Sequence, residues 1–181
     1  KWGQGVVYRT TDGGESWHQA NQPGQLPADA LISDLLVDPR NSQHLYLACP
    51  AGVYQSSDAG ANWTCTSAGL PHRHVRRIAL CRTQPQVMYL TLQSPPGQKP
   101  WQGGVYRSED GGKTWSPRCA GLTQSVGPAK GPAPLTSNYD RLVAHPTNPD
   151  IVYVGGDAWV SATIYKSSDG GRNWATTVRT A

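Results

Sequence analysis

The side chains best suited to bind a ligand stand in or directly after three long segments between predicted strands, at residues 93–104, 117–138 and 155–163. Exposed tryptophan and tyrosine rings can stack on sugar rings or anchor a protein partner. Long irregular loops on a rigid scaffold are also where binding sites usually lie. We therefore predict a ligand-binding surface formed by Trp101, Tyr139, Asp140 and Trp159, with His72 and Asp157 on the same side. In the alternative, Trp101 and Trp159 fold down over their own loops.

The remaining reactive side chains form no pattern for metal or cofactor chemistry. The four cysteines, Cys49, Cys65, Cys81 and Cys119, include no Cys-x-x-Cys pair. A zinc site is therefore not predicted, and neither a metal nor a cofactor is expected. Free buried thiols are the simplest interpretation, and the redox compartment stays open.

Charge and hydropathy argue against two further classes of function. The net charge is +4, and the one local concentration of basic residues runs from His72 to Arg77, where we expect a solvated loop that enters a strand. Nucleic-acid binding needs a continuous basic face with stacking aromatic residues, and the sequence does not indicate one. No run of 18 apolar residues occurs, so no membrane segment is predicted within these residues.

One motif, which we call the box motif, occurs four times. Its copies read VYRTTDGGESW at residues 7–17, VYQSSDAGANW at 53–63, VYRSEDGGKTW at 105–115 and IYKSSDGGRNW at 164–174. Repetition at a period of tens of residues indicates a repeat architecture.

Each box motif has the chemistry of a β-hairpin. The apolar residue and tyrosine are typical of a strand. Serine, threonine and aspartate side chains bond nearby backbone amides, and glycine supplies the positive φ of a tight turn. The tryptophan then starts the next strand and packs back over the turn. We predict a structural role for the box residues, with all four tryptophans largely buried: Asp12, Trp17, Asp58, Trp63, Asp110, Trp115, Asp169 and Trp174.

Two further strands precede each of the last three box motifs. They are predicted at residues 31–38 and 44–49, 75–80 and 87–92, and 140–144 and 151–154. Each unit thus has four antiparallel strands, as a propeller blade requires. We predict an all-β fold, a partial β-propeller of about three and a half blades. The half blade (strands three and four) is expected at residues 1–24 and the complete blades at 25–71, 72–123 and 124–181. A closed ring of about six to eight blades would need further blades outside this chain.

The box motif resembles the Asp-box, or BNR repeat, which joins the third and fourth strands of propeller blades. The phrase VAHPTNPDIVY at residues 143–153 is similar to the corresponding stretch of xyloglucan-cleaving hydrolases. Related patterns occur in sortilin-type receptors and in the photosystem II assembly propeller. The resemblance covers nearly the whole chain and implies the fold. Sialidases carry an Arg-Ile-Pro motif that Arg77-Ile78-Ala79 does not match, so a sialidase is not predicted.

The resemblance to xyloglucan hydrolases implies one catalytic residue. Those enzymes have a catalytic aspartate four residues after the tyrosine of that phrase, a position that Asp157 occupies after Tyr153. Glycoside hydrolysis usually needs two carboxylates, and in those enzymes the second comes from another propeller. After Asp157 the sequence departs from the family pattern. The alternative role for Asp157 is a turn carboxylate that caps backbone amides.

Two functions stay open from the sequence. The one we favour is a non-catalytic module that binds a protein or a polysaccharide through its loop-rich rim. The alternative is part of the active-site cleft of a glycoside hydrolase. The resemblance implies a secreted protein, extracellular or periplasmic.

Overall fold

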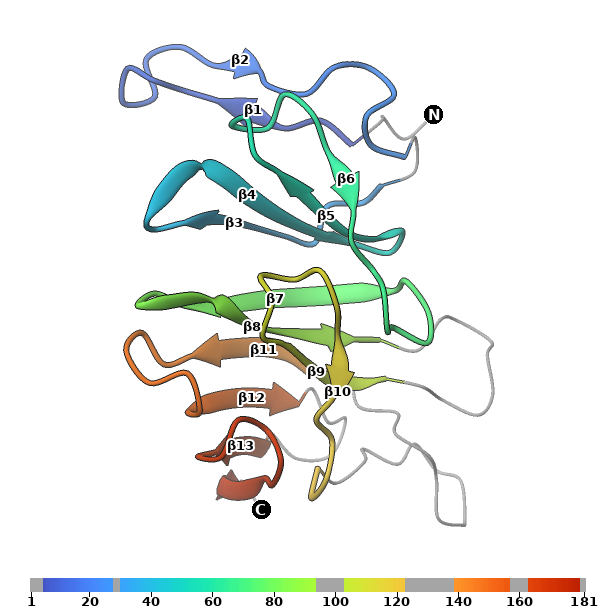
Figure 1. Cartoon of the computed structure of the whole chain (residues 1–181), viewed down its shortest axis with the longest axis vertical. Helices are drawn as coiled ribbons and strands as arrows, with labels where there is room; N and C mark the ends of the chain where they lie inside the picture. The colour runs from blue at the N-terminus through green and yellow to red at the C-terminus, as the bar shows by residue number, and fades with distance from the viewer. Residues whose placement is uncertain (1–4, 28–29, 94–102, 123–138, 157–162, 180–181) are drawn as a thin grey trace.

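The computed structural model describes residues 5–27, 30–93, 103–122, 139–156 and 163–179. Regular structure in these ranges consists of β-strands alone, arranged in one two-stranded and three four-stranded antiparallel sheets. Figure 1 shows the sheets stacked one after another along the long axis, in chain order. The predicted all-β fold, with three successive four-stranded blades after a half blade, is confirmed.

Each sheet is a meander in which neighbouring strands are consecutive in the chain. The first sheet joins β1 (Tyr8–Arg9) and β2 (His18–Gln19). The second contains β3 (Asp34–Asp38), β4 (Asn41–Cys49), β5 (Gly52–Ser56) and β6 (Thr64–Cys65). The third contains β7 (Val75–Cys81), β8 (Gln84–Leu92), β9 (Gly104–Ser108) and β10 (Ser116–Pro117). The fourth contains β11 (Tyr139–Ala144), β12 (Val152–Gly156), β13 (Thr163–Ser167) and β14 (Ala175–Arg179). The residue bounds predicted for the blades as units stay predictions.

The hydrophobic core lies between the sheets. Leu47 and Trp63 of the second sheet pack with Val7 of the first. Tyr46 of the second sheet packs with Trp115 of the third, and further clusters of this kind fill the junction between the third and fourth sheets. Because each sheet buries a face against every sheet next to it, stacking the sheets produces the core.

The strand register defines two opposite rims. Val75 pairs with Leu92, and Leu92 pairs with Gly104, so β7 starts, β8 ends and β9 starts at the same rim. Tyr139, Gly156 and Thr163 share that rim in the fourth sheet, and we call it the loop-rich rim. The box turns and the turns between first and second strands lie at the opposite rim; the latter are on the left of Figure 1.

Side-chain hydrogen bonds hold the box turns as the sequence predicts. Asp58 accepts from the backbone amide of Asn62 at 2.9 Å and from the hydroxyl of Ser56 at 2.8 Å. The Ser56 hydroxyl in turn accepts from the amide of Gly60 at 2.8 Å. The same bonds recur in the box turns of Asp110 and Asp169. The box turn is therefore a closed network that ties two strands together.

Three box tryptophans are buried, but Trp17 is not. Trp63, Trp115 and Trp174 are 7%, 4% and 7% exposed, whereas Trp17 is 59% exposed. The prediction that all four are buried is therefore wrong at Trp17. The indole nitrogens of Trp115 and Trp174 donate to carbonyls of the preceding repeat, at Thr66 and Arg118. A box tryptophan thus packs against the preceding sheet, and the described residues place no sheet on that side of Trp17.

Candidate functional site at the loop-rich rim

The structure places Tyr139 and Asp140 at the loop-rich rim, at the start of β11. Trp101, Asp157 and Trp159 lie outside the described residues. The Tyr139 side chain is buried and packs edge to face on Tyr165, with the ring centroids 6.2 Å apart. Tyr139 therefore belongs to the core and offers no exposed ring for a ligand to stack on.

Asp140 lies among arginines that the starts of β7 and β11 bring together. Arg76 Nε donates to Asp140 Oδ1 at 2.8 Å, and the two side chains are 44% and 24% exposed. The neighbouring Arg141 is exposed and donates from Nη1 to the Asp140 carbonyl at 3.0 Å. This ion pair joins the third and fourth sheets at the surface.

The Arg77 side chain donates hydrogen bonds to backbone carbonyls on both sides of the third sheet. Its Nε donates to the Asp140 carbonyl at 2.8 Å, and its Nη1 donates to the Ser33 carbonyl at 2.6 Å. Ser33 precedes β3, and its hydroxyl returns a bond to the Val75 carbonyl at 3.1 Å. Arg77 thus links the first strands of three successive sheets at one point of the rim.

We call Arg76, Arg77 and Arg141, with Asp34 and Asp140, the rim arginine cluster. Asp34 Oδ2 accepts from the backbone amide of Ile78 at 3.2 Å, and Asp140 is paired with Arg76. The cluster contains more guanidinium groups than carboxylates. A guanidinium presents five N–H donors in a planar fork that matches the geometry of a carboxylate. The cluster can therefore bind a carboxylate from outside.

Sequence reasoning missed Arg76 and Arg77 as site residues. The basic run from His72 to Arg77 is the signal: its two arginines lie within β7, the strand predicted to follow the loop, and their side chains bond to neighbouring sheets. Their partners are 44 to 64 residues away in the chain. The useful signal is the position of the two arginines at the start of the first strand of a sheet.

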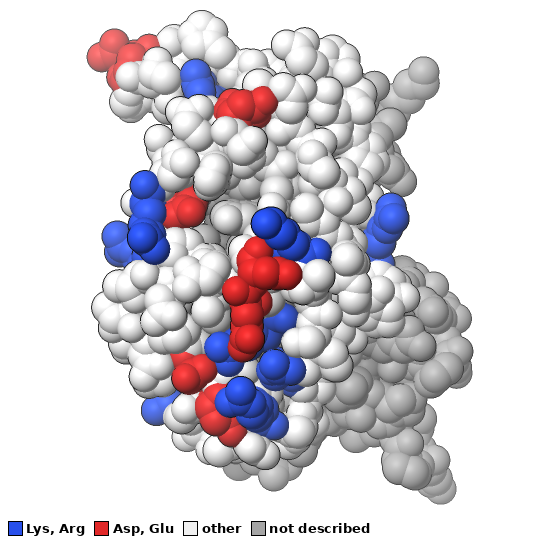
Figure 2. Space-filling model, in the orientation of Figure 1, with Lys and Arg blue, Asp and Glu red and all other residues white. Residues whose placement is uncertain are grey.

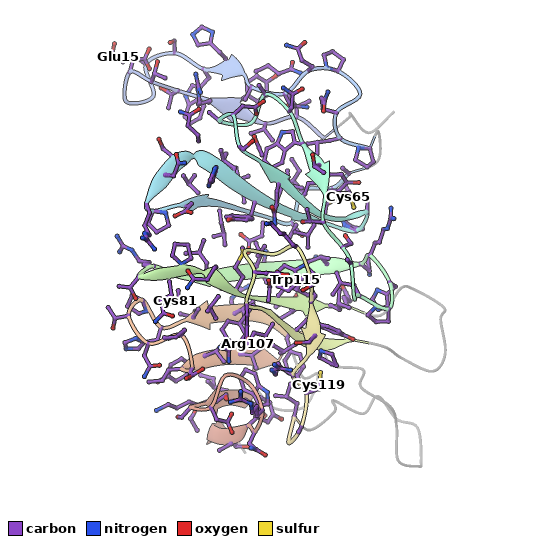
Figure 3. All side chains as sticks on the ribbon, viewed as in Figure 1. Glu15, Cys65, Cys81, Arg107, Trp115 and Cys119 are labelled. Carbon is purple, nitrogen blue, oxygen red and sulfur yellow. The ribbon has the colours of Figure 1, made fainter. Side chains whose placement is uncertain are left out.

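Cysteine and metal-binding groups give no second site in the residues described. No disulfide joins the four cysteines, all of which lie within the described residues; Cys49 and Cys81 are buried, whereas Cys65 is exposed. Burial raises the pKa of the Cys119 thiol. Figure 3 labels three of these cysteines, and they lie apart from one another. No group of three histidine, cysteine, aspartate or glutamate side chains gathers as a metal site within the described ranges.

Surface charge is mixed on the face that Figure 2 shows. Acidic and basic side chains lie next to one another along the middle and lower part of that face. They do not separate into one large patch of a single sign in that view. In the part of the chain that the structure describes, no helix is long and apolar enough to span a membrane.

Successive antiparallel four-stranded sheets, stacked with their first strands in contact, define a β-propeller. The chain belongs to the family described as the DUF6242 beta propeller domain, which matches residues 2–181.

Two curated relatives are xyloglucanases. One, from a Paenibacillus species, is 29% identical over 133 residues, which are 62% of this chain and 13% of the relative. The other, Xgh74A of Acetivibrio thermocellus, is 26% identical over 94% of this chain and 28% of the relative. The chain thus spans less than a third of the length of either relative.

Xyloglucanases and YCF48 are among the solved structures with the same fold. The GH74 xyloglucanase from Xanthomonas campestris superposes with a TM-score of 0.67 at 21% identity, over 94% of this chain and 26% of that one. YCF48 from Cyanidioschyzon merolae gives a TM-score of 0.55 at 21% identity, over 86% of this chain and 39% of that one. The structure of YCF48 bound to a D1 peptide superposes with a TM-score of 0.52 at 22% identity, over 87% of this chain and 42% of that one. Similarity at this level supports the fold.

Proposed function

We propose that this chain is a non-catalytic β-propeller module that binds a carboxylate-bearing protein or glycan at its loop-rich rim. The rim arginine cluster carries the proposal. Arg141 is exposed and Arg76 is 44% exposed, so both guanidinium groups can reach a partner in solvent. Charge-assisted bonds between guanidinium and carboxylate groups are among the stronger hydrogen bonds in proteins.

The rigidity of the cluster favours recognition. Arg77 and the Arg76–Asp140 pair hold the starts of β7 and β11 together, so the exposed donors are already in place before a partner arrives. A preorganised site loses less conformational entropy on binding than a flexible one. Peptide binding also occurs on this fold, since YCF48 has been solved with a D1 peptide.

The carboxylates of the cluster support the non-catalytic part of the proposal. Glycoside hydrolysis usually needs one carboxylic acid and one carboxylate on either side of the scissile bond. Asp140 is bonded to Arg76, and Asp34 accepts a backbone amide of the neighbouring sheet. Both have structural partners.

A binding experiment with three probes tests this function. The probes are a glutamate-rich peptide, polygalacturonate and neutral xyloglucan, and the variants are Arg76→Gln and Arg141→Gln. We expect an acidic probe to bind, and each variant to weaken that binding about tenfold, with a marked salt dependence.

Arg40→Gln is the matched control, because Arg40 is an exposed arginine in the turn between β3 and β4 at the opposite rim. It should leave binding unchanged. Equal losses for Arg40→Gln and Arg76→Gln, or binding of neutral xyloglucan alone, would contradict the proposal.

A second candidate is part of a glycoside hydrolase cleft, as the xyloglucanase relatives suggest. Gly156, which pairs with Tyr139 at the loop-rich rim, directly precedes Asp157 in the sequence. An extracellular or periplasmic location accompanies either function and remains a prediction.

A further inference from the structure

Two β-bulges bring Arg76 and Asp140 together at the loop-rich rim. The pairing of β7 with β8 shifts its register at Arg76, and the pairing of β11 with β12 shifts at Asp140. Each is the extra residue of a first strand, and the ion pair at 2.8 Å joins them. Bulges redirect side chains and are over-represented next to active sites. The two charged groups are therefore presented by a local feature that neighbouring sheets share.

The two carboxylates of the rim arginine cluster differ in what they can still accept. Both oxygens of Asp34 accept backbone amides, Oδ1 from Leu35 at 3.1 Å and Oδ2 from Ile78 at 3.2 Å. Asp140 uses Oδ1 for Arg76, and its Oδ2 receives no hydrogen bond within the described residues. The Asp140 side chain is 24% exposed. Its Oδ2 is thus an open hydrogen-bond acceptor beside guanidinium donors.

The guanidinium groups next to Asp140 keep donors for a ligand. Arg76 uses Nε for the Asp140 carboxylate, and Arg141 uses Nη1 for the Asp140 carbonyl. Each guanidinium has five N–H donors, so most donors of these two groups have no acceptor among the described residues. Arg77 binds two neutral carbonyls, so these bonds do not neutralise its charge. The cluster therefore presents positive charge, unused donors and one open acceptor.

A matching ligand combines two opposite groups. A carboxylate accepts from the guanidinium groups, and a hydroxyl donates to Asp140 Oδ2. A hexuronic acid carries both groups on one ring, which fixes their spacing and limits the entropy lost on binding. An aspartate or glutamate side chain has the carboxylate without the hydroxyl and brings a second negative charge close to Asp140. The open acceptor therefore favours an acidic sugar over an acidic peptide.

We infer that the rim arginine cluster binds a uronic-acid residue of a glycan, whose carboxylate accepts from Arg76 and Arg141 and whose ring hydroxyl donates to Asp140. The inference rests on the proposed function and narrows its ligand to one chemical class. Asp140 is the residue that determines specificity, because it rewards a hydroxyl beside the carboxylate and repels an acid that lacks one. The two arginines exclude neutral glycans, which offer them no anion.

Calorimetric titration of the full-length protein with three probes tests this inference. The probes are trigalacturonate, its methyl ester and a capped triglutamate peptide with the same number of carboxylates as trigalacturonate. We expect trigalacturonate to bind about tenfold more tightly than the peptide, because a hydrogen bond to a charged acceptor is gained and a repulsion is avoided. The methyl ester should lose at least that much, since it keeps the hydroxyls and has no charge for the arginines.

Two matched variants assign the preference to Asp140. Asp140→Asn should reduce the ratio of the trigalacturonate and peptide affinities about fivefold, because the charged acceptor and the repulsion are both lost. Asp34→Asn removes the same charge from a carboxylate whose oxygens already accept backbone amides. It should change both affinities alike and leave their ratio unchanged. Thermal unfolding confirms that each variant is folded at the temperature of the titration.

The outcomes separate this inference from the proposed function. Equal or tighter binding of the peptide by the wild type overturns the inference without the need for any variant. An unchanged ratio in Asp140→Asn, or the same change in Asp34→Asn, also overturns it. In each of these cases the proposed function stands if Arg76→Gln still weakens binding of the peptide. If neither trigalacturonate nor the peptide binds, the proposed function and the inference are both wrong.

Discussion

Arg107 occupies the space that a β-carbon on Gly170 would need. The Arg107 guanidinium lies under the box turn of the following sheet, where Nη1 donates to the Gly170 carbonyl at 3.3 Å and to Asp150 Oδ1 at 3.0 Å (Figure 3). Gly170 has φ +74°. The equivalent residue of the second box motif is Ala59, the one described non-glycine residue with positive φ, and together with Arg9 it lines a cavity of about 300 Å³. The residue after the box aspartate can therefore carry a methyl group where no side chain of the preceding sheet occupies that space.

The first prediction concerns the first glycine of the box turn. We expect Gly111→Ala to lower the free energy of unfolding by about 1 kcal/mol, since φ is +72° there and a β-carbon meets nothing within 4 Å. Gly170→Ala should cost about 3 kcal/mol or more, because the methyl displaces a buried cation from its partners. Urea unfolding measures both, and Gly111→Ala is the matched control. Equal costs for the two variants would show that Arg107 does not fix this position.

The second prediction uses the two kinds of box tryptophan. Trp115→Ala should destabilise the protein by about 3–5 kcal/mol, through lost burial and the cavity left in the junction between sheets. Trp17→Ala should change stability by no more than about 0.5 kcal/mol, because its ring is 59% exposed. Thermal or urea unfolding of the two variants, side by side, distinguishes them. A large loss at Trp17 would mean that another part of the protein covers this ring in solution.

Acid should weaken the box turns, which is the third prediction. The backbone amide and side chain of Asn62 lower the pKa of Asp58 from 3.8 to about 2. Asn173 does the same for Asp169. Burial opposes the shift at Asp110, but hydrogen bonds from Thr114 and Ser108 outweigh it and bring the pKa to about 2.

The sign of the effect follows from the direction of these shifts. A carboxylate whose pKa is lower in the folded state adds stability above its unfolded pKa and loses it as pH falls toward its folded pKa. The stabilisation should therefore be complete above about pH 4 and decline toward pH 2. Urea midpoints measured at pH 5, 3.5 and 2.5 test this, and Asp110→Asn should reduce the dependence. A midpoint that does not change between pH 5 and 2.5 would be incompatible with the shifts.

Local chemistry explains why most of the fold could be predicted. The box turns depend on side chains within a few residues, such as Ser108 and Asp110, so the motif itself specifies the hairpin. The predicted strands at 75–80 and 87–92 appear as β7 and β8 with their ends extended by a few residues. Short turns and consecutive pairing leave few alternatives for the topology.

The features that escaped prediction depend on contacts between sheets. Trp17 stands at the same position of the box motif as Trp63, and its exposure follows from what packs on the preceding side. Arg77 binds carbonyls 44 and 63 residues away, which no local pattern specifies. The position of Tyr139 at the end of a long loop predicts a ligand-binding residue, but its ring packs on Tyr165. Burial at a junction depends on both sheets that form it, so the sequence of one repeat does not specify it.

The last prediction separates the two candidate functions through Asp157. Asp157→Asn removes the charge and nearly preserves the shape of the side chain. If the protein is a glycoside hydrolase, the full-length variant should lose turnover of xyloglucan by orders of magnitude, because one of two essential carboxylates can no longer exchange or share a proton. If the chain is a binding module, Asp157→Asn should change affinity for the acidic probe little, while Arg141→Gln weakens it. Wild-type protein is assayed in parallel on xyloglucan and a β-glucan panel. Hydrolysis by the wild type that disappears in Asp157→Asn would establish the enzyme and reject the non-catalytic module, whereas the absence of wild-type hydrolysis on every polysaccharide would reject the enzyme.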